Sequence, residues 1–248
     1  MSINMAFSFP KETEKAKSNK WPVLIPVGTM EYHSAHCAYG CDSLVSIGMI
    51  NKVAEKIDAV VMPPIWYGVA SFAVAGPEKN TINVNCDTFE DYVYEILKSL
   101  IYGGWRNIYM IISHQTEDYN PMSLACMKAA RKLIFEYLED TRGKGWWGSN
   151  EMKDFYGSLD ATDNPWNWIK TLISVPDNVH KKLGKNDHAG IFECSMLKAL
   201  HPEAVKEERI SEAEEWFTKT AKNMSVELGE EIVRLSVDEL VRIIKDNK

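Results

Sequence analysis

The sequence lacks several features that mark particular classes of protein. No stretch approaches the roughly 18 to 20 apolar residues that a helix needs to cross a bilayer. Residues 1–20 contain Lys and Glu where a secretory signal would need an unbroken apolar core. Internal repeats and low-complexity tracts are also absent. We therefore expect a cytoplasmic protein with no membrane segment.

Clustered positive charge and a disulfide framework are missing too. The 28 Lys and Arg residues are scattered and outnumbered by 35 Asp and Glu, which gives a net charge of −7. Nothing in this distribution attracts a nucleic acid. Cysteines are odd in number, unlike a disulfide framework, and they are Cys37, Cys41, Cys86, Cys126 and Cys194. A small-molecule substrate and reduced thiols are the expectation.

Apolar runs alternate with helical patterns along the chain. The apolar runs predict strands at 21–27, 59–62, 107–113 and 171–175. The helical patterns predict helices over 44–57, 87–100, 121–138 and 189–200. Asp87 or Thr88 is the predicted cap of the second helix, and Asp187 or His188 that of the last. Such alternation indicates an α/β fold with a mainly parallel sheet and helices on both faces. With 248 residues, of which 45% are hydrophobic, we expect one domain spanning 1–248.

Two further segments are assigned from their composition and periodicity. Residues 211–246 show helical periodicity, and we assign them a packing role. Residues 142–186 are rich in Gly, Asp, Asn and Pro, and a connection of this length is typical of a lid or an oligomer contact. An aromatic side chain can stack on a flat amide or on a sugar ring, so the four tryptophans of this segment are candidate substrate contacts. Packing is the alternative for at least two of them. They are Trp146, Trp147, Trp166 and Trp168.

Potential metal ligands are concentrated directly after the first predicted strand. Glu31, His33, His36 and Asp42 fall within twelve residues at the end of that strand. In open parallel sheets this edge is where ligands bind. Residues two apart in an extended segment point the same way, so Glu31 and His33 can serve neighbouring positions. Asp42 has two carboxylate oxygens, which suits it to bridge two cations.

Two later residues can join this group. His114 follows the strand predicted at 107–113 and reaches the same sheet edge, and Glu193 lies near the start of a later helix. Carboxylates and imidazoles without a required thiolate suit two divalent ions, Zn²⁺ or Mn²⁺. Taken singly, each side chain has an alternative reading as a structural hydrogen-bonding group.

A rival interpretation is a structural zinc site. It would use His33, His36, Cys37 and Cys41. Structural zinc sites usually combine two well-separated pairs of ligands, and this set offers only one short segment. The paired catalytic centre is therefore the favoured reading.

The order of these motifs resembles the creatininase (creatinine amidohydrolase) family. Residues 25–42 match the family's spacing of Glu, His, His and Asp. Three further stretches agree in order: 63–68 with Ser71, the pair Ser113 and His114, and 188–195. The resemblance covers about 21–202 and implies a three-layer α/β/α sandwich with a binuclear metal centre.

The resemblance also implies roles for the ligands. Asp42 would bridge the two ions, Glu31 and His114 would hold one, and His33 with a glutamate would hold the other. That glutamate is Glu193 as first choice, because its motif is intact. Glu117 is the alternative, since residues 115–118 depart from the family pattern after His114.

Catalytic and substrate-binding residues follow from the same resemblance. His188 would lie beside the metals without binding them and would move a proton between water and leaving group, with Glu193 beside it; a helix cap is the alternative for His188. Substrate-binding candidates, besides the four tryptophans, are Tyr67, Ser71 and His36. Residues 72–81 lack the family's usual pattern, which favours a substrate other than creatinine.

The predicted activity is hydrolysis of a C–N bond in a small cyclic or formyl amide by a metal-activated water. One alternative keeps the metal centre and opens a keto-cyclitol, such as 3-dehydro-scyllo-inosose, by hydrolytic C–C cleavage. Another is a non-catalytic ligand-binding protein. The resemblance further implies a homo-oligomer, commonly a hexamer built from dimers.

Overall fold

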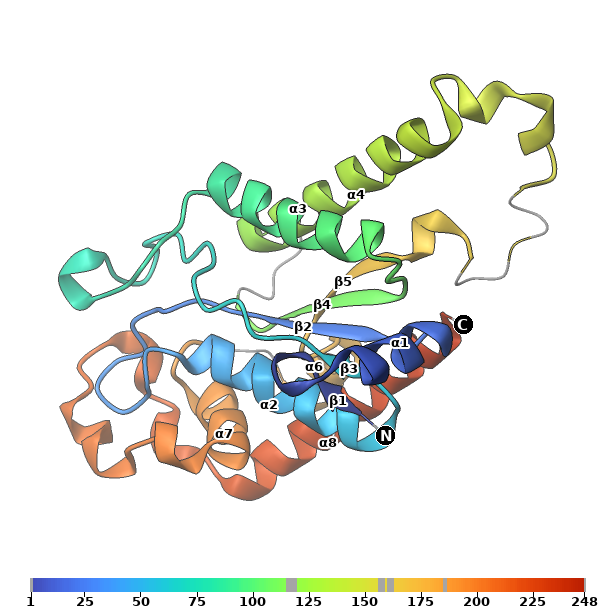
Figure 1. The fold of residues 1–248 in the computed structure, drawn as a ribbon. Coiled ribbons are helices and arrows are strands. Elements are labelled where there is room, and N and C mark those ends of the chain that lie inside the picture. The colour runs from blue at the N-terminus through green and yellow to red at the C-terminus, as the bar shows by residue number, and fades with distance from the viewer. Residues whose placement is uncertain (1, 115–119, 156–158, 160–162, 185–186, 248) are drawn as a thin grey trace.

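The computed structural model describes residues 2–114, 120–155, 159, 163–184 and 187–247. Its centre is one sheet of five parallel strands in the order β1-β3-β2-β4-β5 (Figure 1). The strands are β1 (Ile3–Asn4), β2 (Val23–Val27), β3 (Val60–Val61), β4 (Ile108–Ile112) and β5 (Ile169–Ile173). The four predicted strands are therefore present, each within two residues of its expected start.

Strands β2 and β4 form the middle of the sheet. They pair in register from Val23 opposite Ile108 to Val27 opposite Ile112. Every residue of both strands is buried, which explains why they are continuous apolar runs rather than alternating patterns. Because the two strands end side by side, the segments that follow them start at the same edge of the sheet.

Helices cover both faces of the sheet, as Figure 1 shows. On one face, α3 (Cys86–Tyr102) and α4 (Pro121–Arg142) pack on side chains such as Ile25 and Met110. On the other, α2 (Cys41–Lys56), α6 (Asp177–Leu183), α7 (Ile191–Leu200) and α8 (Val226–Asp246) pack on Leu24 and Ile111. The predicted three-layer α/β/α sandwich is confirmed.

Helix starts differ from the sequence-based expectation where capping residues compete. Helix α3 is capped by Asn85, whose side chain accepts from the Asp87 amide, and not by Asp87 or Thr88. Helix α2 starts at Cys41, three residues before the predicted start, with Gly40 as an N-cap that lacks a side-chain bond. The earlier start places Asp42 in the first turn of α2.

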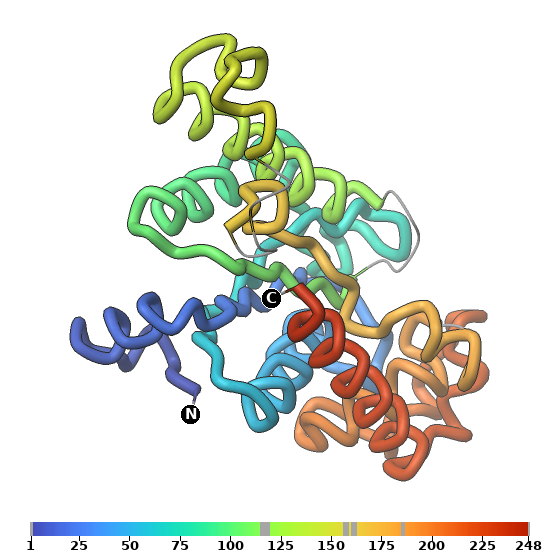
Figure 2. The backbone as a smooth tube through the Cα atoms, turned by 90° about the vertical axis from the view of Figure 1, so that its right-hand side faces the viewer, coloured from blue at the N-terminus to red at the C-terminus, as the bar shows by residue number. Residues whose placement is uncertain are grey.

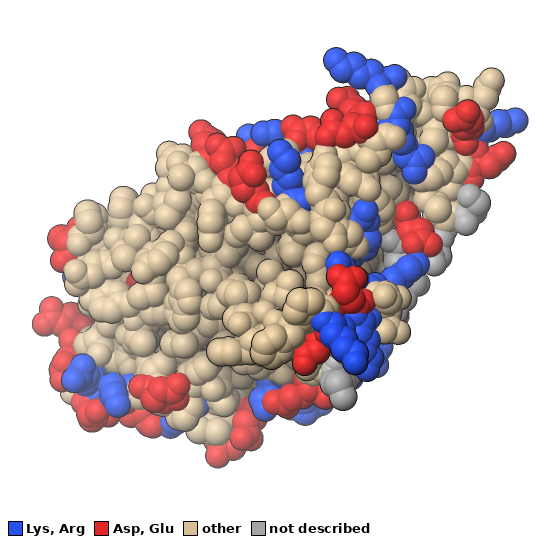
Figure 3. Space-filling view, in the orientation of Figure 1, with Lys and Arg blue, Asp and Glu red and all other residues tan. Residues whose placement is uncertain are grey.

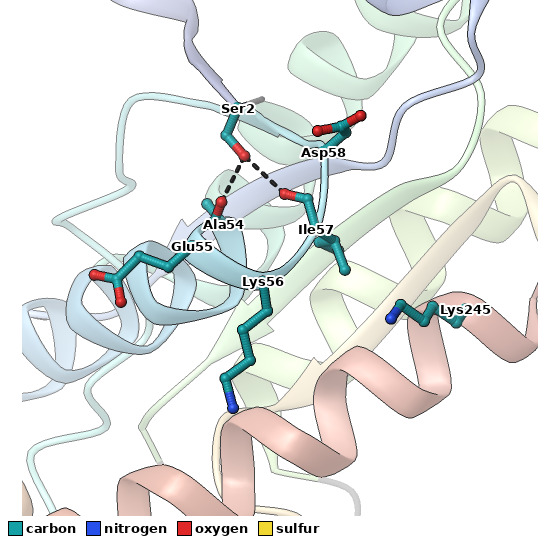
Figure 4. A pocket seen from close by; sticks show the side chains of 7 residues that line it. All are labelled: Ser2, Ala54, Glu55, Lys56, Ile57, Asp58 and Lys245. Atoms are coloured by element: carbon teal, nitrogen blue, oxygen red, sulfur yellow. Dashed lines mark hydrogen bonds between the residues drawn. The ribbon is translucent and has the colours of Figure 1, made fainter.

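The N-terminal region forms structure that the sequence analysis did not predict. Residues Ile3 and Asn4 add β1 to the edge of the sheet, and α1 (Pro10–Ser18) follows. Pro10 occupies the first turn of α1, where its missing N–H has no cost, and the Phe9 amide donates to the Glu12 carboxylate at 2.9 Å. The Ser2 hydroxyl donates to the carbonyls of Ala54 and Ile57 at the end of α2 (Figure 4).

Two long segments have little regular structure. The end of α4 and the short 3₁₀ helices at 146–148 and 150–152 project away from the sheet, and Figure 2 shows this part standing apart at the top. Residues 202–223 form short 3₁₀ helices between α7 and α8, whereas the helical periodicity had been read from 211. None of the described helices is long and apolar enough to span a bilayer.

Close packing of α7 on α8 depends on Gly229. A Cβ built on Gly229 would lie 1.9 Å from the carbonyl oxygen of Ser195 and 2.8 Å from the Ala199 Cβ. Backbone atoms cannot yield as a flexible side chain would, so any substituent must push the two helices apart. The glycine is required by this contact and not by its backbone angles.

We expect Gly229→Ala to destabilise the fold by about 1 to 3 kcal/mol, because overpacking outweighs the helix propensity that alanine gains. Thermal unfolding should shift down by roughly 2 to 10 °C. Gly148→Ala is the matched control, since a Cβ there meets no atom within 4 Å. An unchanged melting temperature for Gly229→Ala would show that α7 and α8 are less closely packed than described.

Candidate metal centre

Five buried polar side chains converge at the carboxyl edge of the sheet. Two follow β2, one lies in the first turn of α2, one follows β4 and one lies in the first turn of α7. None exposes more than 5% of its surface. They are Glu31, His33, Asp42, His114 and Glu193, the set that the sequence analysis selected as metal ligands.

Glu31, Asp42 and His114 form the first ligand group. The Nδ1 atom of His114 lies 3.1 Å from Asp42 Oδ2 and 3.3 Å from Glu31 Oε2. One potential ligand atom from each residue lies within 4.8 Å of the other two. Carboxylate oxygen and imidazole nitrogen both bind a borderline divalent cation such as Zn²⁺.

His33 and Glu193 form the second ligand group together with the other oxygen of Asp42. The Nε2 atom of His33 lies 3.5 Å from Glu193 Oε2 and 3.7 Å from Asp42 Oδ1. These separations exceed those of good hydrogen bonds and are close to the roughly 3.4 Å between two ligand atoms of one tetrahedral zinc ion. Asp42 therefore directs Oδ2 to one group and Oδ1 to the other, the geometry of a bridging carboxylate.

The tautomer of His33 fits this reading. Its Nδ1 lies 3.0 Å from the carbonyl oxygen of Glu31 and must donate a hydrogen there. Nε2 is then the nitrogen left for a metal, and within the described part of the chain it has no hydrogen-bond partner although it is buried. Burial lowers the pKa of His33, but Cys41, Glu193 and Asp42 outweigh burial and raise it, so an ion would displace a proton from Nε2. A backbone carbonyl that fixes the tautomer is common behind metal-ligating histidines. An orphaned, correctly oriented imidazole nitrogen is the observation that best fits a metal here.

Glu193 is held by the start of α7. The Ala189 amide donates to its carboxylate at 2.7 Å. Asp187 accepts from the amides of Phe192 and Glu193. The N-cap residue is Gly190 and not Asp187 or His188 as predicted, and α7 starts at Ile191. The Asp187 carboxylate satisfies the first-turn amides because glycine has no side chain to do so.

Cys41 belongs to the second group, which the sequence analysis missed. Its thiol, the imidazole of His33 and the carboxylate of Glu193 form a set of ligand atoms within 4.8 Å of one another. The structure divides the four residues of the rival zinc site between two places, since His36 and Cys37 group with Cys194. A cysteine beside Asp42 in sequence was the available signal.

His188 lies over the second group. Its ring stacks on that of His33 with centroids 4.2 Å apart, and the ring of Phe217 packs nearly perpendicular to it with centroids 5.1 Å apart. Nε2 donates to the Tyr32 carbonyl oxygen at 2.9 Å, so Nδ1 is the nitrogen available to hold or release a proton. His188 also groups with Glu31 and His33 within 4.8 Å.

A surface network holds the segment that carries Phe217. Glu215 accepts hydrogen bonds from Tyr32, Ser34 and Lys79, at 2.7, 2.7 and 2.9 Å. Burial alone would raise the pKa of Glu215, but these three donors lower it to about 2. The sequence had assigned residues 211–246 only to packing, so Glu215 and Phe217 were missed.

The remaining substrate-binding candidates do not all reach the centre. Gly68 and Ile82 lie beside Thr29, which places the loop carrying Tyr67 and Ser71 next to the segment that follows β2. His36 is buried and faces the carbonyl of Ala189 at 3.0 Å, away from the Asp42 groups. Ser34, with a φ of 61°, turns the chain between His33 and His36. Glu117 lies outside the described residues.

The four tryptophans lie at the opposite edge of the sheet within one chain. Trp168 directly precedes β5, at the amino edge, whereas all five candidate ligands lie at the carboxyl edge. Trp146, Trp147 and Trp166 line a cavity of about 560 Å³ with Phe135. The structure therefore does not bring these side chains to the metal centre of their own chain.

Protonation of His114 predicts how metal binding depends on pH. Burial would lower the pKa of this imidazole, but Asp42 and Glu31 outweigh burial and raise it to about 10. The metal-free protein therefore keeps this proton below pH 10, and a divalent ion must displace it. We expect apparent Zn²⁺ affinity to rise roughly tenfold per pH unit between pH 6 and 8.

Calorimetric titration in two buffers of different ionisation enthalpy measures this release, with at least one proton expected per chain. Equal affinity at pH 6 and pH 8, with no proton released, would mean that His114 does not bind the ion.

Fold and site together define an α/β protein with a candidate site for paired divalent cations at the carboxyl edge of its sheet. The family model described as Creatininase: Creatinine amidohydrolase matches residues 9–244. The chain therefore belongs to the creatininase family, and it is a hydrolase.

Two curated relatives match parts of the chain. The creatinine amidohydrolase of Pseudomonas putida is 25% identical over 193 residues, which cover 76% of this chain and 67% of the relative. The 3-dehydro-scyllo-inosose hydrolase of Thermotoga maritima is 28% identical over 102 residues, which cover 41% of this chain and 32% of the relative.

Solved structures of creatininase share the fold along nearly the whole chain. A variant of the Zn-Zn type has a TM-score of 0.74 at 21% identity, and a structure described as creatininase Mn has 0.73 at 22%. A variant complexed with creatine has 0.73 at 21%. Each comparison covers 99% of this chain and 98% of the other.

Proposed function

We propose that this protein is a binuclear-metal-dependent hydrolase that cleaves a C–N bond in a small cyclic or formyl amide. The observation that carries the proposal is Asp42, whose two oxygens face two separate groups of buried ligands. The orphaned Nε2 of His33 supports it, because a buried imidazole nitrogen without a partner is costly unless it binds something. Zinc and manganese are the proposed metals, supported by the Zn-Zn and Mn forms of structurally similar creatininases.

Two divalent ions would supply the activation of a water molecule and the polarisation of the amide carbonyl. The protein's own contribution is to orient the ligands and to manage protons. The Tyr32 carbonyl fixes His188 so that Nδ1 is free to take a proton from the attacking water and to give it to the departing nitrogen. Glu193, held by the Ala189 amide, stays ionised beside it, since its pKa is lowered despite complete burial by His33 and His188.

The wall around His188 favours a small, flat substrate. Phe217 packs nearly perpendicular to its ring, and Trp216, whose ring contacts Phe217, is 78% exposed. Aromatic faces stack well on planar amides. The hydrogen bond from the Tyr32 hydroxyl to Glu215 ties the segment that carries both aromatic residues to Tyr32, so that this side of the site is preorganised.

Opening of a keto-cyclitol by C–C cleavage is the second candidate. The match to the Thermotoga maritima inosose hydrolase favours it, although that match covers only part of each chain. Both reactions use the same ligand groups, and vicinal oxygens on a cyclitol ring suit two adjacent cations. Family membership indicates a hydrolase, which weighs against the non-catalytic alternative.

A substrate panel separates these candidates. Purified protein reconstituted with Zn²⁺ or Mn²⁺ should be offered creatinine, hydantoins, formylated amines and keto-inositols, with products identified by mass. Release of ammonia or an amine supports C–N cleavage, and an open-chain keto acid supports cyclitol opening. A protein that binds no divalent metal and hydrolyses nothing in the panel would overturn the proposal.

The source of the second glutamate ligand is a separate prediction. Glu193→Gln should lose one of two ions per chain, because the neutral amide is a weak ligand and the His33 group then has one carboxylate fewer. Glu117→Gln should retain both. Metal content after gel filtration, measured with the two variants side by side, gives the answer. Loss of an ion from Glu117→Gln alone would assign the ligand to Glu117 instead.

Several wider properties stay predictions. A single domain over residues 1–248, a cytoplasmic location and a homo-oligomer, by resemblance a hexamer, belong to the proposal. Exposed aromatic residues support the oligomer, since Phe7, Phe9 and Trp147 expose 61% or more of their surface.

The charge distribution in Figure 3 supports the oligomer as well, because the middle of this face has a broad area without charged residues. Acidic and basic residues alternate around its rim, which supports a partner other than nucleic acid.

A further inference from the structure

A second cluster of metal-ligand side chains lies behind the proposed catalytic centre. It contains His36, Cys37 and Cys194, called here the thiol cluster. The two sulfur atoms are 3.1 Å apart, and Cys194 Sγ is 3.4 Å from His36 Nε2. All three residues are at least 92% buried, and their ligand atoms lie within 4.8 Å of one another. None of the three belongs to the ligand groups around Asp42.

The backbone holds this cluster in place from two sides. Cys37 forms an antiparallel bridge with Val205, flanked by bonds from the Ala38 amide to the Ala204 carbonyl and from the Lys206 amide to the His36 carbonyl. Cys194 lies in the first turn of α7. A site built on paired backbone and a helix is fixed before any ligand arrives, which lowers the cost of binding.

Packing alone does not account for the polar atoms in the cluster. The Nδ1 atom of His36 is buried, and within the described residues it has no hydrogen-bond partner. Its Nε2 faces both the Ala189 carbonyl and the Cys194 sulfur. If the cluster served only packing, small apolar residues could replace both thiols and the imidazole, and no buried polar atom would lack a partner. The cluster therefore has the composition of a ligand set for a soft cation.

Distances favour a metal over a disulfide. In a tetrahedral site with Zn–S near 2.3 Å and Zn–N near 2.05 Å, two sulfurs would lie about 3.8 Å apart and a sulfur and a nitrogen about 3.6 Å. The observed sulfur–nitrogen distance of 3.4 Å is close to this value, and the sulfurs at 3.1 Å need only a small separation. A disulfide needs about 2.05 Å and thus a larger movement of two residues on fixed backbone.

Charge balance also permits an ion here. The thiolates of Cys37 and Cys194 would together neutralise a divalent cation, so the buried complex would carry no net charge. The carboxylates of Glu31, Asp42 and Glu193 remain for the ions of the catalytic centre. A third cation therefore does not compete with the proposed pair for charge.

We propose that His36, Cys37 and Cys194 form a third metal site, distinct from the Asp42 pair, that binds a soft thiophilic cation such as Zn²⁺, Cd²⁺ or Cu⁺. Binding of a divalent ion at His36 Nε2 releases two thiol protons and moves the imidazole proton from Nε2 to Nδ1, with no change in oxidation state. The hydrogen bond from Nε2 to the Ala189 carbonyl is given up in this step. The ion would join the segment after β2, which carries Glu31 and His33, to the helix that carries Glu193. The site is structural with respect to hydrolysis and does not depend on the proposed activity.

The test uses the metal-free full-length protein loaded with Cd²⁺, with excess removed by gel filtration. We expect three ions per chain and an ultraviolet cadmium–thiolate band in the otherwise unaltered protein. In a Cys41→Ser background only the band is compared, and not the ion count, because Cys41 belongs to the second ligand group. Cys194→Ser should lose one ion and the band. Cys126→Ser, a buried cysteine on the opposite face of the sheet, should retain both and serves as the matched control.

Asp42→Asn separates this proposal from the proposed function. It should lose the catalytic ions and keep one ion with two sulfur neighbours in X-ray absorption, a result that does not require Cys194→Ser to fold. Cadmium without sulfur neighbours in Asp42→Asn, or a third ion that survives Cys194→Ser, would overturn the site. Recovery of Cys37 and Cys194 as a disulfide, with no sulfur-bound ion after reduction, would overturn it as well.

Discussion

Replacement of Asp42 by Asn should remove both catalytic ions and lower kcat by roughly 10³- to 10⁵-fold. The amide keeps the shape of the carboxylate but loses its charge and one of its two acceptor oxygens, so that it cannot bridge the Glu31 and His33 groups. The loss corresponds to several kcal/mol of transition-state stabilisation that paired cations supply. Asp42 directs one oxygen to the His114 imidazole of the first group and the other to the His33 imidazole of the second.

The measurement is metal content together with kcat on the best substrate from the panel. Asp91→Asn, the same change on the exposed side of α3, is the control and should alter neither quantity. Should Asp42→Asn keep two ions and most of its activity, the two ligand groups would not share a carboxylate, and the binuclear proposal would be wrong.

Replacement of His188 by Ala should lower kcat by roughly 10²- to 10⁴-fold and leave the metal content unchanged. Its ring stacks on His33 but is not needed for either ligand group, and its bond to the Tyr32 carbonyl aims Nδ1 as a proton carrier. The limb of the pH–rate profile that reports this proton should disappear in the variant.

His201→Ala is the control, because His201 pairs with Glu203 near the surface and belongs to none of the described ligand groups. Metal loss from His188→Ala would make His188 a ligand. A small loss of activity with an unchanged pH profile would leave it a purely structural contact.

Much of the site could be predicted because the topology is simple. The apolar runs that became β2 and β4 are buried on both faces, so their composition alone identified them. Parallel strands end at one edge, and this brings Glu31 and His114 together although 83 residues separate them in number. The proposed bridging role of Asp42 was suggested by its two oxygens, and the structure gives the directions in which they point.

The missed residues depend on contacts that no local pattern encodes. Phe217 and Glu215 reach the site because the irregular chain between α7 and α8 folds back over Tyr32. Cys41 became a neighbour of His33 because α2 starts early, at a glycine cap that gives no capping signal. These are tertiary effects, which override local preferences.

For the tryptophans, a usable signal was overlooked. Trp168 lies three residues before the strand predicted at 171–175 and directly before β5 as observed, and in a parallel sheet the residues before a strand lie at its amino edge. Trp146, Trp147 and Trp166 share a cavity near it. The expectation of a substrate wall rested on aromatic composition, which says nothing about the edge of the sheet. A lid or interface role for 142–186 stays a prediction.

The contact between Gly229 and the Ser195 carbonyl gives the C-terminal helix an influence on a centre that it never touches. Helix α8 backs α7 two residues from Glu193, and its far end is tied to β4 by the bond from Asn247 to the Tyr109 hydroxyl. Substitutions in the contact between α7 and α8 would change the tilt of α7. The distance between Glu193 and His33 in the second ligand group would change with it. A search for altered metal preference should therefore include the rear of α7, where substrate is never encountered.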